Sequence, residues 1–135
     1  MIIDTSALIA VERTGDELGA VLIPFAGEDV ALPAIVWAEL LVGVRLAGNA
    51  DVAARRRAKL EQIRLRVPII EFDARTAEHY ADIFSECAKN GCPIPQNDMA
   101  VAATARCLAC RVLVGRQNEK HFRCVPGLEL AVLPC

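Results

Sequence analysis

Apolar and polar positions along the chain form blocks that predict short buried strands separated by helices. Short apolar runs bounded by polar or turn residues are typical of buried strands, whereas apolar residues spaced three and four apart indicate helices. The predicted strands are 1–3, 29–32, 68–72, 111–114 and 128–133. The predicted helices are 7–12, 16–25, 33–46, 50–66, 74–89 and 99–109.

Turn and capping residues mark several boundaries of these elements. Pro33 is expected in the first turn of its helix, where proline is tolerated, and Asp73 is expected to cap the helix that Asn90 and Gly91 end. We predict a polar loop over 115–123. The sequence has no internal repeat or linker, so we expect a single domain, 1–135.

The alternation of strands and helices predicts an α/β fold. Such a pattern favours a mostly parallel sheet with helices on both faces. In open sheets of this kind, ligands bind at the carboxyl ends of the strands. Polar residues that directly follow a predicted strand are therefore the first candidates for a functional site.

Composition limits the kinds of partner that the chain can bind. With 135 residues and 54% hydrophobic content, one domain can bury a substantial core. The formal net charge is −2 and aromatic residues make up 4%, so the chain lacks both overall positive charge and a series of rings for base stacking. Any nucleic-acid site must be local.

The amino terminus and the cysteines indicate the compartment. Asp4 lies where a secretory signal would carry positive charge, and the longest apolar run, 30–38, is well short of the roughly 20 residues that span a bilayer. We therefore expect a cytoplasmic protein without a membrane partner. In that compartment the six cysteines are expected to be free thiols, including Cys107 and Cys110 of the C-x-x-C pair.

Three acidic residues lie at positions that favour a functional site. Asp4 follows the first strand and Asp98 opens a helix with an apolar face, although each is also placed to serve only as a helix cap. Glu39 lies among apolar helical neighbours, where a carboxylate needs a partner such as Arg45, a raised pKa, or a route to the surface.

Carboxylates that converge repel one another, and a divalent cation relieves this repulsion. Magnesium prefers oxygen ligands and keeps several of its waters. Held by one or two carboxylates, it neutralises a phosphate and helps to activate water. Convergence of the three acids would therefore favour phosphate chemistry.

Four segments of the chain resemble a known family. They are Met-Ile-Ile-Asp-Thr-Ser at the start, Pro-Ala-Ile-Val-Trp-Ala-Glu-Leu around Glu39, Asn-Asp-Met-Ala-Val-Ala-Ala around Asp98, and Asn-Glu-Lys-His-Phe from Asn118 with Val-Pro-Gly-Leu behind it. Together, in this order, they resemble the PIN domain of VapC toxins. The resemblance implies a three-layer α/β/α fold around a central, mostly parallel sheet and metal-dependent cleavage of RNA.

The resemblance also implies roles for individual residues. Asp4 and Asp98 correspond to metal ligands, Glu39 completes the acidic cluster directly or through water, and Ser6 supports it. Many relatives carry a fourth acid after strand four, where this chain has Asn118. Glu119 is an alternative source of that charge. The implied cofactor is Mg²⁺, with Mn²⁺ as a substitute.

Substrate contact is assigned to cations near the expected site. Arg116, Lys120 and Arg123 are the candidates for RNA phosphates. The charged helix 50–66 is the most basic part of the chain, and its arginine triplet 55–57 is expected to be mainly a solvated face.

The resemblance further implies a toxin of a type II toxin–antitoxin pair. Such a toxin inhibits translation or growth until a VapB-like antitoxin neutralises it, and it contacts DNA only through that antitoxin. A homodimer or a hetero-oligomer with the antitoxin is expected. The apolar residues Trp37, Leu40, Leu41 and Val44 are candidates for a partner groove, although burial in the chain's own core is the alternative.

Two other functions fit parts of the sequence. A non-catalytic PIN-like module that binds RNA or protein would explain the missing fourth acid. A phosphatase with Asp4 as nucleophile would need a second aspartate two positions later, where this chain has Ser6. The sequence also lacks a Walker or G-x-G-x-x-G glycine loop.

Overall fold

A computed structural model describes residues 1–134 and consists of short strands connected by helices. The strands are β1 (Ile2–Ile3), β2 (Leu32–Pro33), β3 (Ile69–Ile70), β4 (Val112–Gly115) and β5 (Leu130–Leu133). The helices are α1 (Thr5–Thr14), α2 (Leu18–Val21), the 3₁₀ turn η1 (Ile23–Phe25), α3 (Ala34–Arg45), α4 (Ala50–Arg66), α5 (Ala74–Lys89), α6 (Gln96–Cys107) and α7 (Arg116–Phe122).

The strands pair in parallel throughout the described residues, which confirms the predicted parallel sheet. Strands β1, β4 and β5 form one sheet in that order, with Ile2 opposite Val112, and β2 pairs with β3. A parallel bridge between Ile2 and Ala31 joins the two sheets. The spatial order is therefore β3-β2-β1-β4-β5. After β1, the chain adds β2 and then β3 on one side of β1. It then crosses back and adds β4 and β5 on the opposite side of β1. The direction in which strands are added therefore reverses between β1 and β4.

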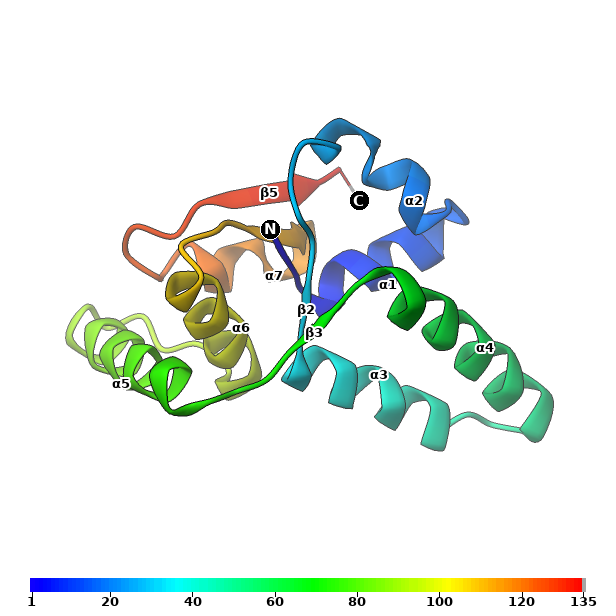
Figure 1. Ribbon diagram of the computed structural model, residues 1–135. Coiled ribbons are helices and arrows are strands. Elements are labelled where there is room, and N and C mark those ends of the chain that lie inside the picture. Colours follow the sequence, from blue (N-terminus) through cyan, green and yellow to red (C-terminus); the bar gives the residue numbers. More distant parts are fainter. Residues whose placement is uncertain (135) are drawn as a thin grey trace.

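Helices cover both sides of these strands. Figure 1 shows α5 and α6 on one side of β2 and β3, and α1 and α4 on the other. Ile3, Val112, Leu113 and Val114 are fully buried, as expected for strands that helices cover on both faces. The mixed α/β class with a central parallel sheet is thus confirmed.

Local chemistry explains where the main helices begin. The side chains of Asp4, Asn49 and Asp73 accept backbone N–H groups at the start of α1, α4 and α5. These carboxylate and amide oxygens satisfy donors that have no partner within the helix. Gly15 ends α1 in the left-handed conformation with φ of 74°, which glycine adopts without strain.

The region 115–123 differs from its prediction. It was expected to be a polar loop, but Arg116–Phe122 is helix α7. A helix of seven residues shows no full apolar period, and only Phe122 of this one is buried. The ion pair between Glu119 and Arg123, four residues apart, supports the helix from its exposed side.

Several predicted boundaries also differ from the structure. The predicted helix 16–25 is split into α2 and η1, where Pro24 lies in the 3₁₀ turn. Pro33 ends β2 and caps α3 rather than lying in its first turn. Helix α6 begins at Gln96, so Asp98 lies inside its first turn and is not its cap.

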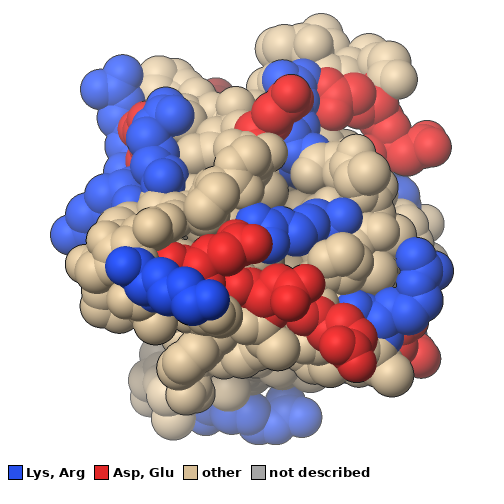
Figure 2. Space-filling model, turned by 90° about the vertical axis from the view of Figure 1, so that its left-hand side faces the viewer, with Lys and Arg blue, Asp and Glu red and all other residues tan. Residues whose placement is uncertain are grey.

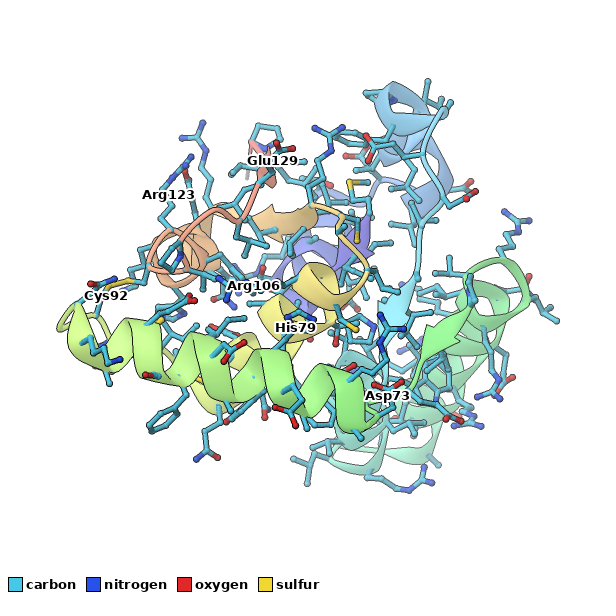
Figure 3. All side chains as sticks on the ribbon, turned by 60° about the vertical axis from the view of Figure 1, so that its left-hand side comes forward. Asp73, His79, Cys92, Arg106, Arg123 and Glu129 are labelled. Atoms are coloured by element: carbon cyan, nitrogen blue, oxygen red, sulfur yellow. A yellow bond between two sulfur atoms is a disulfide. The ribbon has the colours of Figure 1, made fainter. Side chains whose placement is uncertain are left out.

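The expectation of free thiols is wrong for two cysteines. Cys92 and Cys124 form a disulfide, with 5.8 Å between their Cα atoms. The chain turns at Gly91 after α5 and brings Cys92 beside the end of α7, a proximity that local sequence does not reveal (Figure 3). Cys87, Cys107 and Cys110 are free, as expected. Cys135, and with it the end of the expected domain 1–135, lies outside the described residues.

Within residues 1–134, no helix is long and apolar enough to cross a membrane.

Candidate active site

Asp4 lies at the carboxyl end of β1, at the point where the winding of the sheet switches. Its backbone N–H donates to Leu113 O of β4 at 3.0 Å, and its side chain is buried. The carboxylate Oδ2 accepts Ser6 N–H at 3.0 Å and so caps α1. Among residues 1–134, no donor is bonded to Oδ1. The recorded hydrogen bonds of the Asp4 carboxylate within residues 1–134 therefore all fall on Oδ2, the oxygen that caps α1.

Ser6 connects the ends of β1 and β4. Its hydroxyl donates to Asp4 Oδ2 and accepts the backbone N–H of Gly115 at 2.9 Å. A Cβ atom on Gly115 would lie 2.6 Å from the carbonyl oxygen of Ser6, closer than atoms pack. Only glycine lets the backbone of β4 approach α1 this closely. Ser6 thus contacts Asp4 directly, and its supporting role stays a prediction.

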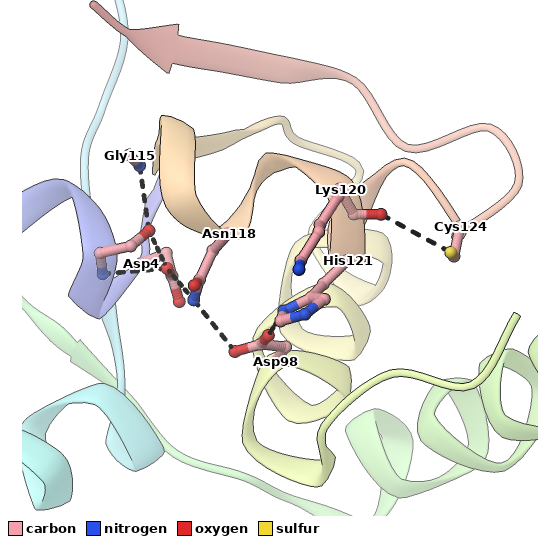
Figure 4. Close-up of polar contacts among 8 residues, drawn as sticks. Asp4, Asp98, Gly115, Asn118, Lys120, His121 and Cys124 are labelled. Carbon is pink, nitrogen blue, oxygen red and sulfur yellow. Dashed lines mark hydrogen bonds and ion pairs between the residues drawn. The ribbon is translucent and has the colours of Figure 1, made fainter. Parts of the chain in front are cut away.

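Asp98 reaches the same place from α6. Its side chain is 11% exposed. The amide nitrogen of Asn118 lies 3.4 Å from Asp4 Oδ2 and 3.5 Å from Asp98 Oδ1, so one group on α7 contacts both carboxylates (Figure 4). The structure thus brings together Asp4, Asp98 and Asn118 from three separate elements.

His121 is the residue that the sequence prediction missed. Its Nδ1 lies 2.6 Å from Asp98 Oδ2, and its side chain is 28% exposed (Figure 4). On a helix, residues three apart share a face, so α7 places His121 next to Asn118. A helical prediction for 116–122 would have shown this pairing. The loop prediction concealed it.

The environment of Asp98 works against its ionised form. Burial raises the pKa of Asp98, the hydrogen bond from His121 opposes this, and the negative charges of Asp4 and Glu39 raise it further. The net direction of the pKa change is upward. Adding positive charge at this cluster would therefore relieve an unfavourable interaction.

Glu39 is held at the margin of the cluster by a hydroxyl group. Thr5 Oγ1 donates to Glu39 Oε2 at 2.7 Å, which links α1 to α3. No ion pair of Glu39 is found in residues 1–134, so Arg45 is not its partner in this structure. Glu39 is close enough to Asp98 to raise its pKa.

Glu119 faces away from the other acids. Its Oε1 accepts Arg123 Nε at 2.8 Å and Arg123 Nη2 at 2.6 Å, on the exposed side of α7. It does not supply the missing fourth acid in this arrangement. The residues of α7 that do contact the cluster, Asn118 and His121, bring an amide and an imidazole.

The three predicted RNA-binding cations differ in whether an acidic side chain of the protein already pairs with them. Arg116 and Lys120 are exposed, and Arg116 lines a hollow of about 280 Å³ between α1 and α7 together with Arg13. Arg123 is paired with Glu119. Of these three predicted RNA contacts, Arg116 and Lys120 are therefore the freer cations.

The arginines of α4 are mostly engaged within the chain. Arg57 pairs with Glu61, Arg56 donates to Gly43 O, and the guanidinium of Arg64 lies over the Trp37 ring. These contacts agree with the interpretation of α4 as a solvated face. On the face that carries α5, Figure 2 shows basic and acidic side chains interspersed rather than one positive field.

The donor set fits a hard cation that keeps part of its water shell. Among residues 1–134, no three His, Cys, Asp or Glu side chains are close enough, as they stand, to hold an ion together. Magnesium needs only one or two carboxylates when waters fill the remaining positions. The carboxylates of Asp4 and Asp98 both lie near the amide of Asn118, so they supply the one or two carboxylates that magnesium needs. The ionised form of Asp98 is disfavoured where it lies, and a cation would offset that charge.

Comparison with known proteins identifies similar sequences and structures. The family model described as PIN domain matches residues 1–123. Ribonuclease VapC5 of Mycobacterium tuberculosis is 34% identical over 126 residues, which cover 93% of this chain and 87% of that protein.

Two solved structures extend the similarity to the fold. VapBC2 from Rickettsia felis, bound to a DNA fragment from its promoter, superimposes with a TM-score of 0.84 at 22% identity and covers 98% of this chain and 97% of that one. VapBC-5 from Mycobacterium tuberculosis, a member of the VapBC family of toxin–antitoxin systems, has a TM-score of 0.73 at 27% identity, with coverage of 98% and 95%.

Proposed function

Because this chain belongs to the PIN-domain family and to its VapC ribonucleases, we propose that it is the toxin of a type II toxin–antitoxin pair and cleaves RNA with a divalent cation, Mg²⁺ or its substitute Mn²⁺. The observation that carries this proposal is the contact of one amide, that of Asn118, with both Asp4 and Asp98. Two buried carboxylates on either side of one amide, near the switch point of a parallel sheet, would suit a divalent cation that keeps part of its water shell.

Each residue of the cluster has a distinct task. Asp4 and Asp98 hold the cation, and Glu39 acts on it directly or through water. Ser6 fixes the orientation of Asp4 by its hydrogen bond and by its link to Gly115. Asn118 holds the two carboxylates at a common distance. Glu119 supports α7 through Arg123 and takes no direct part.

The reaction is hydrolysis of an RNA phosphodiester bond by water. When bound, a divalent cation offsets the negative charge of the scissile phosphate and polarises the attacking water. The chain supplies the carboxylates that position this charge. It also supplies Arg116 and Lys120 as cations for neighbouring phosphates, with Arg123 as a weaker third because Glu119 competes for it.

A VapB-like antitoxin is the proposed regulator. Related VapBC complexes contain both partners, and one of them is bound to promoter DNA, so this chain would contact DNA only through its antitoxin. Val42 and Leu46 of the α3 region are exposed apolar side chains, 53% and 78% accessible, that suit an apolar partner segment. Of the groove residues expected from the sequence, Val44 is buried and Trp37 and Leu40 pack against the core.

The remaining proposals concern organisation and place of action. Residues 1–135 are proposed to form one PIN domain that assembles as a homodimer or with the antitoxin. We place its action in the cytoplasm, where its RNA substrates are.

A non-catalytic RNA- or protein-binding module is the second candidate. The observation that favours it is the absence of a carboxylate from α7 in the cluster, because Glu119 is turned to Arg123. Such a module would bind RNA equally well in the presence and absence of a chelator. A nuclease would lose its cutting activity under chelation.

Cleavage of a structured RNA pool by partner-free protein tests the proposal. Wild type is expected to cut with Mg²⁺ and to stop with a chelator, and Asp4→Asn and Asp98→Asn are expected to fold and not to cut. Asp82→Asn, at an exposed position of α5, is the matched control and is expected to cut like wild type. Cutting at the wild-type rate by either cluster variant would contradict the assigned site. Absence of cutting by folded wild type across several RNAs and metals would favour the binding module.

A further inference from the structure

The hollow between α1 and α7 is lined by two arginines and by no acidic side chain. It measures about 280 Å³, and its walls carry Ala10, Arg13, Arg116 and Gln117. Helix α7 lies beside α1, so residues from opposite ends of the chain face each other there (Figure 1). A ligand that enters the hollow meets two positive charges.

Neither guanidinium is neutralised by an acid within residues 1–134. No ion pair of Arg13 or Arg116 is recorded there, although three acids lie close to Arg13 in the sequence, within 12–17. Arg13 Nη1 donates to a neutral group, Gln117 Oε1, at 3.5 Å. Two like charges beside one hollow repel each other, and an anion between them would relieve this repulsion.

One face of α1 leads from the acidic cluster to this hollow. Ser6, Ala10 and Arg13 are four and then three positions apart, a spacing that places them on the same side of a helix. Ser6 is bonded to a carboxylate of the cluster. With a rise of 1.5 Å per residue, Arg13 lies about 10 Å farther along α1 than Ser6. The opposite wall begins with Arg116, the first residue after β4.

A phosphate of a nucleic-acid strand is the anion that suits this position. The guanidinium group is planar and donates paired hydrogen bonds that match phosphate oxygens. A strand whose scissile phosphate lies at the cluster continues over the neighbouring surface, with about 3.4 Å between stacked nucleotides and more when the strand is extended. A separation of about 10 Å therefore corresponds to roughly two or three nucleotides.

We propose that Arg13 and Arg116 together hold one phosphate of the RNA strand, roughly two or three nucleotides from the bond that is cleaved. The inference rests on the proposed function, since the scissile phosphate at the cluster sets the position of the strand. It adds Arg13, which the sequence did not indicate as an RNA contact. Lys120 does not line the hollow, so it is expected to contact a different phosphate.

Binding of a fluorescein-labelled oligouridylate that is long enough to extend beyond the cluster on both sides tests the role of Arg13. All proteins carry Asp4→Asn, which prevents cutting. Arg13→Ala is expected to weaken binding roughly tenfold, as for loss of a hydrogen bond to a charged group, and to lower the slope of log affinity against log salt by about 0.7. Arg13→Lys keeps the charge and loses the paired donors, so it should retain the slope and lose only part of the affinity.

Arg75→Ala is the matched control for Arg13→Ala. Arg75 is an exposed arginine of α5 and does not line the hollow. This variant is expected to bind oligouridylate with the affinity and the salt slope of its Asp4→Asn parent. Unaltered affinity and slope in Arg13→Ala as well would overturn the assignment and leave the hollow to a carboxylate of a protein partner.

Double variants show whether the two arginines share one phosphate. Arg13→Ala combined with Arg116→Ala is expected to lower the salt slope by about 0.7, no more than either single variant, because the same contact is lost each time. Arg13→Ala combined with Lys120→Ala is expected to lower it by about 1.4, because two separate contacts are lost. A decrease of about 1.4 for the arginine pair would overturn the shared subsite.

Cleavage of the RNA pool by proteins with intact Asp4 separates this inference from the proposed function. Arg13→Ala is expected to raise KM more than it lowers kcat, since it binds the strand away from the reacting atoms, and to melt at the temperature of wild type. Cutting of RNA by wild type without binding of oligouridylate by the Asp4→Asn parent would overturn the subsite alone. Binding without cutting would overturn the nuclease and keep the subsite. Absence of both would overturn the two together.

Discussion

The backbone N–H of Gly115, at the end of β4, donates to the hydroxyl of Ser6, in the first turn of α1, at 2.9 Å, and Ser6 is also bonded to Asp4. Ser6 in turn holds Asp4. Disturbing the approach of Gly115 to Ser6 should therefore affect both the stability of the fold and the position of Asp4, the carboxylate that we propose holds the cation.

Gly115→Ala tests this contact. The added Cβ would lie 2.6 Å from Ser6 O, which is a backbone atom and yields only if β4 or α1 shifts. We expect a loss of about 1–3 kcal/mol in the free energy of unfolding, as for other overpacked sites, together with reduced cleavage. Chemical denaturation measures the first effect and the RNA assay the second.

Gly43→Ala is the matched control for Gly115→Ala. Gly43 lies inside α3, and a Cβ there meets no atom within 4 Å. Alanine is the better helix former, so this variant should be as stable as wild type or more stable by up to about 1 kcal/mol. Equal stability of the two alanine variants would show that the approach of β4 to Ser6 is not tight.

Thr5→Val removes the hydroxyl that holds Glu39. The Thr5 side chain donates to Glu39 Oε2 at 2.7 Å, and valine keeps its shape without the donor. A hydrogen bond of this kind contributes about 1 kcal/mol, so kcat/KM is expected to fall roughly fivefold if Glu39 acts in the reaction. Thr14→Val, at the exposed end of the same helix, should retain wild-type kinetics. Unaltered cleavage by Thr5→Val would indicate that Glu39 needs no such support.

Asp98→Asn is expected to raise thermal stability while it abolishes cleavage. Because burial and neighbouring acids raise the pKa of Asp98 above its unfolded value, the folded state is most stable with this group protonated. The stabilisation that protonated Asp98 gives to the folded state is complete below the unfolded pKa. This stabilisation is lost as the pH rises through the higher folded pKa. At neutral pH the ionised group therefore costs stability, which the neutral amide avoids.

Thermal melts in metal-free buffer measure this cost. Asp98→Asn should melt above wild type at neutral pH, with the difference shrinking toward acid pH. Added Mn²⁺ or Mg²⁺ should raise the melting temperature of wild type and not that of the variant, because a ligand that binds the folded state stabilises it. A variant that melts well below metal-free wild type would contradict the assigned cost.

The salt dependence of RNA binding separates the three cations near α7. Each phosphate contact on single-stranded nucleic acid contributes about 0.7 to the slope of log affinity against log salt. Arg116→Ala and Lys120→Ala, measured in an Asp4→Asn background that does not cut, should each reduce the slope by about this amount. Arg123→Ala should reduce it less, since Glu119 already neutralises that guanidinium. A larger reduction for Arg123→Ala would reverse this ranking.

The sequence was informative where local pattern and tertiary structure coincide. The apolar run before Asp4 predicted β1, and the run 111–114 predicted most of β4, so the convergence of Asp4 with residues after β4 followed from the parallel sheet. Asp98 was also found, although its helix begins three residues earlier than predicted.

The features that were missed depend on contacts between distant segments. Helix α7 is too short for a periodic signal, so its face toward Asp98, and with it His121, did not emerge from the sequence. The hydrogen-bond partner of Glu39 is Thr5, which lies 34 residues away in the chain, and neither residue type predicts this pairing. Cys92 and Cys124 are 32 residues apart, and nothing in their neighbourhoods indicated that they meet.

The disulfide has a practical consequence for anyone who prepares this protein. Cys92 lies in the connection that leads into α6 and Asp98, and Cys124 directly follows α7 and His121, so the bond ties together the two segments that bear that contact. Purification with dithiothreitol and purification in air would yield two covalently different samples. Metal affinities, melting temperatures and cleavage rates should be compared only between samples whose thiol content has been counted.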